Sequence, residues 1–393
     1  MKTRSILLLM IAEICGMSLW FVSAAVLPGM VAEFPMSAGQ QAALSSGVQG
    51  GFVLGALALA ISGLPDRLDP RKVFAGCAVL AGLANAALLA VPPDTVSAVL
   101  LRVVTGALLA GVYPVGMKIA VGWGSTDRGL LVGALVGAVA LGSASPHFLA
   151  LTGGAANGAD WRTTVMLASG LAIFGGLLAL GAKLGPHHVT AAAFNPKAIG
   201  TAWTNKGVRL AIIGYLGHMW ELYAMWAWIG LIAAASFAIS MPGDDASRLA
   251  TLTAFLVIAL GALVCVPTGW LADRWGKAEV AAGAMVVSGG SALLAALTFG
   301  GPIWLVLPVL LLWGASVIPD SPQLSALVAD HAPADQTGSL LTFQTALGFA
   351  LTMITVQATP VLAGLWGWPT VLVVMALGPV VGVWAMRALI GGR

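Results

Sequence analysis

The chain has 393 residues, of which 59% are hydrophobic and 8% charged, with a mean hydropathy of +0.96 and a formal net charge of +3. An ordinary soluble domain carries about 25% charged residues, so this composition excludes a water-soluble globule. The basic residues stand in short loops between apolar runs, which excludes a basic domain that binds nucleic acid. The composition indicates an integral membrane protein in contact with the lipid bilayer.

Apolar runs of about 20 residues recur along the whole chain, and each is long enough to cross a hydrocarbon core of about 30 Å. Backbone polar groups must be satisfied inside lipid, and the runs lack the alternation of a barrel, so helices are expected. We predict an all-α membrane fold with about twelve transmembrane helices, near residues 5–31, 41–62, 73–91, 95–118, 129–152, 163–182, 208–236, 248–270, 278–299, 302–328, 338–360 and 369–390.

A polar connection divides these helices into two halves of six. It predicts an N-terminal six-helix bundle at 1–182, a cytoplasmic linker at 183–207 and a C-terminal six-helix bundle at 208–393. The halves align with a shift of about 205 residues, which places Val112–Pro114 opposite Val317–Pro319. Parallel repeats of this kind are related by a pseudo-two-fold axis along the membrane normal.

The positions of lysine and arginine predict the orientation. Fifteen of the 18 basic residues fall on the side that holds both termini, only Arg162 and Arg248 fall on the other, and Arg102 lies within a span. Because cytoplasmic loops are enriched in lysine and arginine, we expect both termini in the cytoplasm. The expected location is a bacterial-type inner membrane, crossed many times.

Two charged turns about 200 residues apart repeat the same pattern. The first, 62–72, contains Asp66, Arg67, Arg71 and Lys72, and the second, 269–277, contains Asp273 and Arg274. The first turn resembles the G-x-x-x-D-R-x-G-R-K signature of the major facilitator superfamily, although Ser62 and Asp69 replace its two glycines. The second turn resembles another copy that lacks most of the basic tail.

Two further segments bear on this resemblance. Arg102–Gly106 is similar to the family's R-x-x-x-G motif, and the resemblance covers the whole chain. The Gly-Pro ending of the family's antiporter motif is absent, since Pro146 follows Ser145. The resemblance implies two bundles that rock about a central cavity lined by spans 1, 4, 7 and 10, with the charged turns acting as gate latches.

Ionisable residues inside spans are candidates for function because each costs about 2.5–3.5 kcal/mol to insert. Most of those present lie on spans 1, 4, 7 and 10, and helical spacing places polar and aromatic residues on one stripe of each span. We predict that these stripes line a substrate and proton cavity, formed by Glu13, Arg102, Tyr113, His218, Glu221, Tyr223, Trp228, Asp320 and Gln323. The alternative, open for each, is a structural hydrogen bond or ion pair between helices.

These features favour a secondary active transporter that moves a small organic solute by alternating access, with the proton as coupling ion. The alternative is a proton antiporter that exports drugs or amphipathic compounds; remote alternatives are a membrane sensor that only binds ligand, or an enzyme acting on a lipid or quinone. The sequence holds no nucleotide-binding loop and no metal-type cluster, so we expect no enzyme activity, no catalytic residues and no cofactor. We expect the protein to function as a monomer.

Overall fold

The computed structural model describes residues 1–124, 128–152, 160–188, 195–196, 198–241, 243–333 and 335–392. In these ranges the chain is helical without any strand, and 12 helices or helix pairs are long and apolar enough to cross a membrane. Each corresponds to one of the predicted apolar runs. The prediction of an all-α membrane fold is confirmed.

The N-terminal half supplies six spans. Its elements are α1 (Lys2–Met17), α2 (Val22–Glu33), α3 (Ala38–Ser62), α4 (Leu64–Arg67), α5 (Pro70–Ala86), the 3-10 helix η1 (Ala87–Ala90), α6 (Val96–Leu109), α7 (Tyr113–Val121), α8 (Arg128–Thr152) and α9 (Trp161–Ala179).

The C-terminal half supplies the other six and is preceded by the short helix α10 (Ala198–Thr204). Its elements are α11 (Lys206–Phe237), α12 (Gly243–Trp275), α13 (Lys277–Thr298), α14 (Ile303–Ser316), α15 (Ser321–His331), α16 (Thr337–Trp366), α17 (Trp368–Met375) and α18 (Leu377–Ile390).

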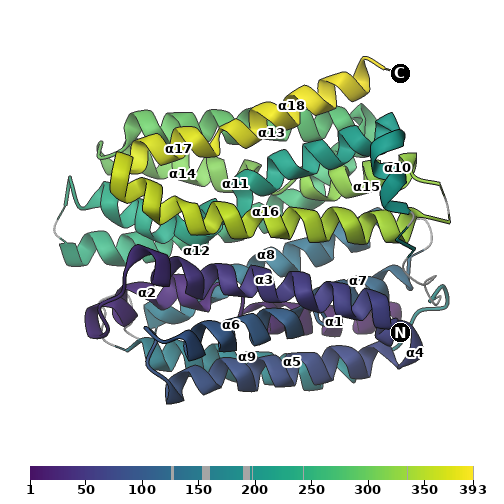
Figure 1. The fold of residues 1–393 in the computed structure, drawn as a ribbon, viewed down its shortest axis with the longest axis horizontal. Coiled ribbons are helices and arrows are strands. Elements are labelled where there is room, and N and C mark those ends of the chain that lie inside the picture. Colours follow the sequence, from purple (N-terminus) through teal and green to yellow (C-terminus); the bar gives the residue numbers. More distant parts are fainter. Residues whose placement is uncertain are drawn as a thin grey trace.

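The helices lie side by side along the long axis of the molecule, with the N-terminal half on one side and the C-terminal half on the other (Figure 1). Both chain termini lie at the same end of the bundle, which we call the terminus end; α4 and α10 lie there too. The opposite end is called the distal end. The two halves meet mainly where α3 packs against α16 and α8 against α12.

Spans 1, 4 and 10 are each interrupted near the middle. Proline explains two of the breaks: Pro114 and Pro322 lie in the first turns of α7 and α15, where the missing N–H leaves no bond to the preceding helix. The break at 18–21 in span 1 contains no proline. Its backbone needs another partner, which is described below.

Glycine allows the closest helix contacts within each half. A Cβ atom on Gly106 of α6 would lie 2.0 Å from the carbonyl oxygen of Val48 on α3. The equivalent contact in the C-terminal half places a Cβ on Gly314 of α14 only 2.1 Å from the carbonyl oxygen of Val257 on α12. Small residues let helix backbones approach in this way in membranes, and both halves have such a contact between corresponding helices, span 4 with span 2 and span 10 with span 8.

The predicted linker forms hydrogen bonds with both halves at the terminus end. The backbone N–H of Lys183 donates to Ser5 Oγ of α1 at 3.1 Å. Thr201 Oγ1 on α10 donates to Gln336 Oε1, beside the start of α16, at 2.6 Å. Residues 189–194 and 197 lie outside the described part of the chain.

Large apolar side chains cover much of the outer surface. Leu297 is 82% exposed, Leu54 62% and Trp384 59%. Such exposure would be unfavourable in water over so many residues, and it is the surface that a hydrocarbon environment requires. The polar and charged side chains of the spans are instead buried inside the bundle.

Candidate functional site

A cavity of about 580 Å³ lies between the two halves on the terminus side of the molecule. Side chains of α3, α7 and α8 line it from one half, and side chains of α15 and α16 line it from the other. It extends from Tyr113 to the helix ends at Pro65, Val121 and Gly338, so it reaches the terminus end.

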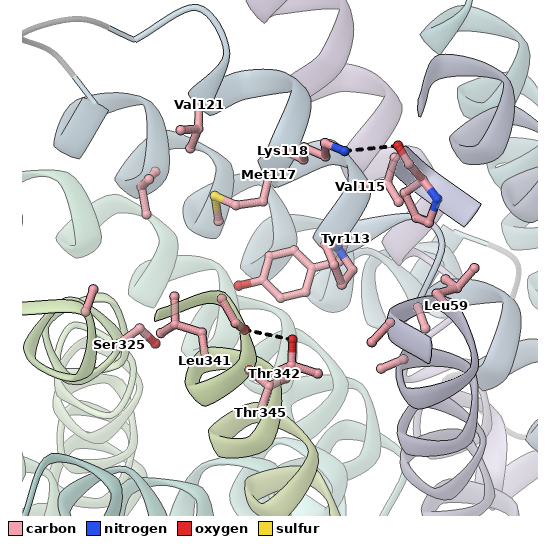
Figure 2. A pocket seen from close by; sticks show the side chains of 18 of the residues that line it. Leu59, Tyr113, Val115, Met117, Lys118, Val121, Ser325, Leu341, Thr342 and Thr345 are labelled. Atoms are coloured by element: carbon pink, nitrogen blue, oxygen red, sulfur yellow. Dashed lines mark hydrogen bonds between the residues drawn. The ribbon is translucent and has the colours of Figure 1, made fainter. Parts of the chain in front are cut away.

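The lining of this cavity is mainly apolar, with hydroxyl groups on one side. Figure 2 shows Tyr113 and Met117 of α7 facing Thr342 and Thr345 of α16 across the space. Among the described lining residues, Lys118 alone carries a full charge. A space of this size and chemistry suits a small organic molecule with both apolar and hydrogen-bonding groups.

Six aromatic side chains close the passage beyond the cavity. We call them the ring seal: Trp20, Phe21, Phe52, Tyr223, Trp226 and Phe349. Three come from each half, and the ring centroids of Phe52 and Phe349 are 4.5 Å apart across the interface. All six are less than 9% exposed. The seal therefore leaves no described route from the cavity to the distal end.

Hydrogen bonds between α3 and α16 add to the closure on the distal side. Gln357 of α16 accepts from Ser46 Oγ at 3.0 Å and donates through Nε2 to the carbonyl oxygen of Gly39 at 3.0 Å. One turn nearer the seal, Met353 fills the space beside Gly50. The two halves thus touch along the distal part of α3 and α16 and separate around the cavity.

Of the nine residues predicted to line the cavity, Tyr113 does so. The other eight lie inside one half or in the ring seal and are buried. The polar stripe predicted on span 10 faces the interior of the C-terminal half, while Ser321, Ser325 and Ala329 on the other side of α15 line the cavity. Arg102, Glu221 and Trp228 are hydrogen-bonded inside their own half. Glu13, His218 and Asp320 are buried there without such bonds to the described residues.

Arg102 holds the break in the first span. Its guanidinium donates to the carbonyl oxygens of Leu19 and Trp20 at 2.9 and 3.0 Å and to Asn85 Oδ1 at 2.7 Å. The side chain is fully buried. Its bonds to Leu19 and Trp20 satisfy carbonyl groups that the interrupted helix leaves open, and no carboxylate among the described residues pairs with it.

Glu13 is buried without a hydrogen-bond partner for either carboxylate oxygen. Its side chain lies against α7 and α5, where a Cβ on Gly116 would be 2.3 Å from Glu13 Oε2, and Phe74 lies beside the same glycine. Tyr113, which lines the cavity, opens the same helix α7. An ionised carboxylate without a partner is very costly to bury, so this site suits a neutral acid.

Glu221 is also buried but fully bonded. Its Oε1 accepts from Trp313 Nε1 at 2.8 Å and its Oε2 accepts from Ser288 Oγ at 2.9 Å. These contacts join α11, α13 and α14 inside the C-terminal half. The pattern is that of a carboxyl group built into a helix interface.

His218 and Asp320 form a buried pair. His218 Nδ1 lies 2.8 Å from Asp320 Oδ1, an ion-pair distance, although the two groups are not aligned as a hydrogen bond. Gln323, one turn further along, is 6% exposed. Among the described residues, no group of three or more His, Cys, Asp or Glu could hold a metal ion.

The two predicted aromatic residues of span 7 have different surroundings. Tyr223 belongs to the ring seal, where its ring lies 5.0 Å from that of Phe349. Trp228 lies outside the seal and donates its indole N–H to the carbonyl oxygen of Val356 at 3.0 Å. The structure therefore brings Tyr223, but not Trp228, to the passage between the halves.

The first charged turn lies at the terminus end. The side chain of Asp66 is outside what the structure describes, while Arg67 and Lys72 are exposed. Lys118 of the cavity donates to the carbonyl oxygen of Pro65 at 3.0 Å. This bond ties the turn to the cavity mouth within the N-terminal half.

Asp69 has a structural role that the sequence pattern did not reveal. It caps α5 by accepting from the backbone N–H of Arg71, and its Oδ2 pairs with the Arg71 guanidinium at 2.6 Å. Arg71 also donates to the carbonyl oxygen of Ala182 at 3.1 Å. The bond from the Arg71 side chain holds the pKa of the Asp69 carboxyl below its usual value.

In the second charged turn, Asp273 and Arg274 are exposed. The Arg274 guanidinium stacks 3.7 Å from the centre of the Trp270 ring. Lys277 pairs with Asp330 at 2.5 Å and so links the start of α13 to α15. No described contact of either turn crosses between the two halves.

Several residues of the site escaped the sequence reasoning. Phe52 and Phe349 complete the ring seal, Asn85 holds Arg102, and Gln357 bridges the halves. The amides had a usable signal, since a carboxamide inside an apolar span is also costly. The phenylalanines had none, because an aromatic ring in an apolar helix is equally compatible with lipid contact.

The family model for the Major Facilitator Superfamily matches residues 9–356 of this chain. Among solved structures, the nucleoside transporter NupG is similar with a TM-score of 0.72 and 14% identity, over 98% of this chain and 99% of that one. A bacterial homologue of the human lysosomal transporter Spinster, inward-facing and unoccupied, has a TM-score of 0.73 and 13% identity, over 100% and 98%. The human organic anion transporter MFSD10 has a TM-score of 0.70 and 15% identity, over 98% and 99%. At these identities the structural likeness concerns the fold.

Proposed function

This chain belongs to the Major Facilitator Superfamily of transporters, and on that premise we propose that it moves a small organic solute across a cytoplasmic membrane by alternating access, coupled to protons. One observation carries the proposal: a cavity between the halves reaches one end, while rings from both halves close the other. This is the arrangement expected of one of the two states of such a carrier. The inward-facing state of the similar Spinster homologue supports the same interpretation.

The distribution of basic residues supports a cytoplasmic location for the terminus end. Arg67, Lys72 and Arg274 are exposed there, and the loops at the distal end hold few basic residues. Positive charge is retained on the cytoplasmic side of a membrane protein. We therefore propose that the cavity opens to the cytoplasm, that both termini lie there, and that the protein acts as a monomer.

Glu13 is our first candidate for the coupling proton site. It is fully buried, both of its oxygens lack partners, and it packs against α7 beside the cavity residue Tyr113. A carboxyl group in this environment gains from carrying a proton. Opening of the neighbouring helices to water would let it release that proton, which ties protonation to the conformational state. Glu221 and Asp320 are the second candidates, because Glu221 is already hydrogen-bonded to Trp313 and Ser288 and Asp320 lies 2.8 Å from His218 Nδ1.

Reconstitution into liposomes tests both parts of the proposal. A solute screen by thermal stabilisation in detergent would be followed by solute flux, with internal pH recorded by a trapped dye. We expect solute addition to move protons in the wild type. Glu13→Gln should abolish proton movement but retain exchange of solute for solute, because the neutral amide mimics the protonated acid.

The matched control is Glu33→Gln, which changes an exposed glutamate paired with Arg162 at the distal end and should leave coupling intact. Retention of coupling in Glu13→Gln, Glu221→Gln and Asp320→Asn together would show that the proton-site assignment is wrong. Absence of flux for every stabilising solute would contradict transport itself.

Export of amphipathic compounds in exchange for protons is the second candidate, favoured by the apolar lining of Leu59, Val115, Met117 and Leu341. Imposing pH gradients of both signs on vesicles of uniform orientation distinguishes the two. Uptake with protons requires solute and protons to move the same way, whereas export by antiport requires opposite directions.

A further inference from the structure

Two buried indole groups in the ring seal lack a hydrogen-bond partner. Trp20 Nε1 and Trp226 Nε1 have no acceptor, although the two side chains are 2% and 1% exposed. The other buried tryptophans that the structure describes all donate their N–H to protein acceptors: Trp161, Trp228 and Trp313. Buried polar groups in proteins are usually paired, and the two unpaired indole groups among the described buried tryptophans both belong to the seal.

Two unpartnered oxygen atoms lie on α3, the helix that carries Phe52 of the seal. Gln49 Oε1 and Ser45 Oγ on α3 are buried without partners, at 1% and 4% exposure of their residues. Three and seven residues before Phe52, they share its face of the helix. The seal therefore combines aromatic faces from both halves with two free indole donors and at least one free amide acceptor.

We propose that the ring seal is also the surface that recognises the transported solute, and that this solute is an uncharged, planar heteroaromatic molecule. The inference rests on the proposed transport function. When the distal end opens, the five ring contacts of the seal that cross between the halves separate. A flat aromatic solute replaces them by stacking, its ring nitrogen or carbonyl atoms accept from the indole groups, and its N–H donates to Gln49.

Other classes of solute fit these groups less well. An organic cation would be attracted to the ring faces. However, the partial positive charge on the two unpaired indole N–H groups would repel it, and none of the six seal residues is a carboxylate. A saturated ring of the same size is not flat and cannot stack. A charged solute would lie among six rings without a counter-ion.

A matched solute panel tests the inference on the intact protein in detergent and in liposomes. The aromatic probes are uracil, adenine and nicotinamide. Dihydrouracil carries the amide groups of uracil on a non-aromatic ring, cyclohexanecarboxamide has the amide of nicotinamide on a saturated ring, and tetraethylammonium is the cation. We expect the aromatic probes to raise the melting temperature and to exchange across vesicles, with uracil bound at least about tenfold more tightly than dihydrouracil.

Two variants and a control locate the effect. Trp226→Phe keeps a ring but removes one donor, so the affinity for uracil should fall about threefold to tenfold. Phe349→Leu removes a ring and should reduce the preference for uracil over dihydrouracil. Trp384→Phe makes the same Trp-to-Phe change on the exposed outer surface. It should change neither the affinity for uracil nor the preference for uracil over dihydrouracil.

The outcomes separate the two proposals. Equal binding of the saturated and aromatic partners, tighter binding of tetraethylammonium, or no binding of any aromatic probe overturns the inference, whether or not another solute is transported. Ring-selective binding without flux in vesicles would support the recognition surface and contradict transport. The wild-type comparison decides even if a variant does not fold.

Discussion

Replacing Arg102 with lysine should loosen the break in the first span while keeping the charge. The guanidinium bonds to the carbonyl oxygens of Leu19 and Trp20 and to Asn85 Oδ1, at 2.7 to 3.0 Å. A single ammonium group cannot reach these separate acceptors as a planar guanidinium does, so we expect at least two of the four bonds to be lost, counting the one from Nε to the carbonyl oxygen of Leu44 at 3.4 Å. A hydrogen bond to a charged group contributes about 1.5–3 kcal/mol, which gives a loss of about 3–6 kcal/mol in the free energy of unfolding.

Unfolding of the purified protein in mixed detergent micelles measures this loss. The matched control is Arg387→Lys on the exposed surface of α18, which should change stability by no more than about 0.5 kcal/mol. A double-mutant cycle with Asn85→Ala should show coupling between Arg102 and Asn85. If Arg102→Lys were as stable as the control, the claim that this side chain holds the interrupted helix would be refuted.

Three further predictions concern packing, closure and pH. Gly106→Ala should lower the melting temperature because its Cβ would meet the α3 backbone, whereas Gly170→Ala, which faces open space, should not; equal melting temperatures would contradict the packing argument. Gln357→Ala removes two bonds between α3 and α16 and should lengthen the distance between spin labels on their distal parts; an unchanged distance distribution would contradict its role in closure. The lowered pKa of Asp69, caused by Arg71, means that its stabilising bond is fully present above about pH 4 and is lost as the pH falls further. Asp69→Asn should therefore reduce the loss of melting temperature on acidification, and an unchanged acid profile would show that the pair does not contribute.

The twelve spans could be predicted because length and hydropathy report directly on the hydrocarbon thickness. The breaks inside spans 1, 4 and 10 were less accessible. Pro114 was recognised only as a repeat marker and Pro322 was not singled out, although proline within a span is a physical reason for a helix to end. The break at 18–21 has no signal of its own, since it is stabilised by Arg102 from another helix.

The site was predicted less well because a polar residue in a span has two ways to avoid lipid. It faces a water-filled cavity, or it bonds to another helix within the bundle, and helical spacing does not distinguish the two. Glu221 and Arg102 bond to other helices within their bundle, and their partners are far away in the sequence. Tyr113 faces the cavity instead. Which of the two occurs depends on which helices pack together, and the residue spacing within one helix carries no information on that.

The contacts within and between the halves differ in kind, and this difference bears on how the molecule would change state. Within each half, backbones meet at Gly106 and Gly314, and such contacts cannot shift without breaking the helix packing. Between the halves, five ring pairs provide much of the distal closure. Ring pairs contribute about 0.5–1.5 kcal/mol each beyond buried area, so the seal holds the closed distal end by roughly 3–8 kcal/mol. That is comparable to the few kcal/mol that separate interconverting states, so a bound solute that restores part of it could shift the balance while each half moves as one body.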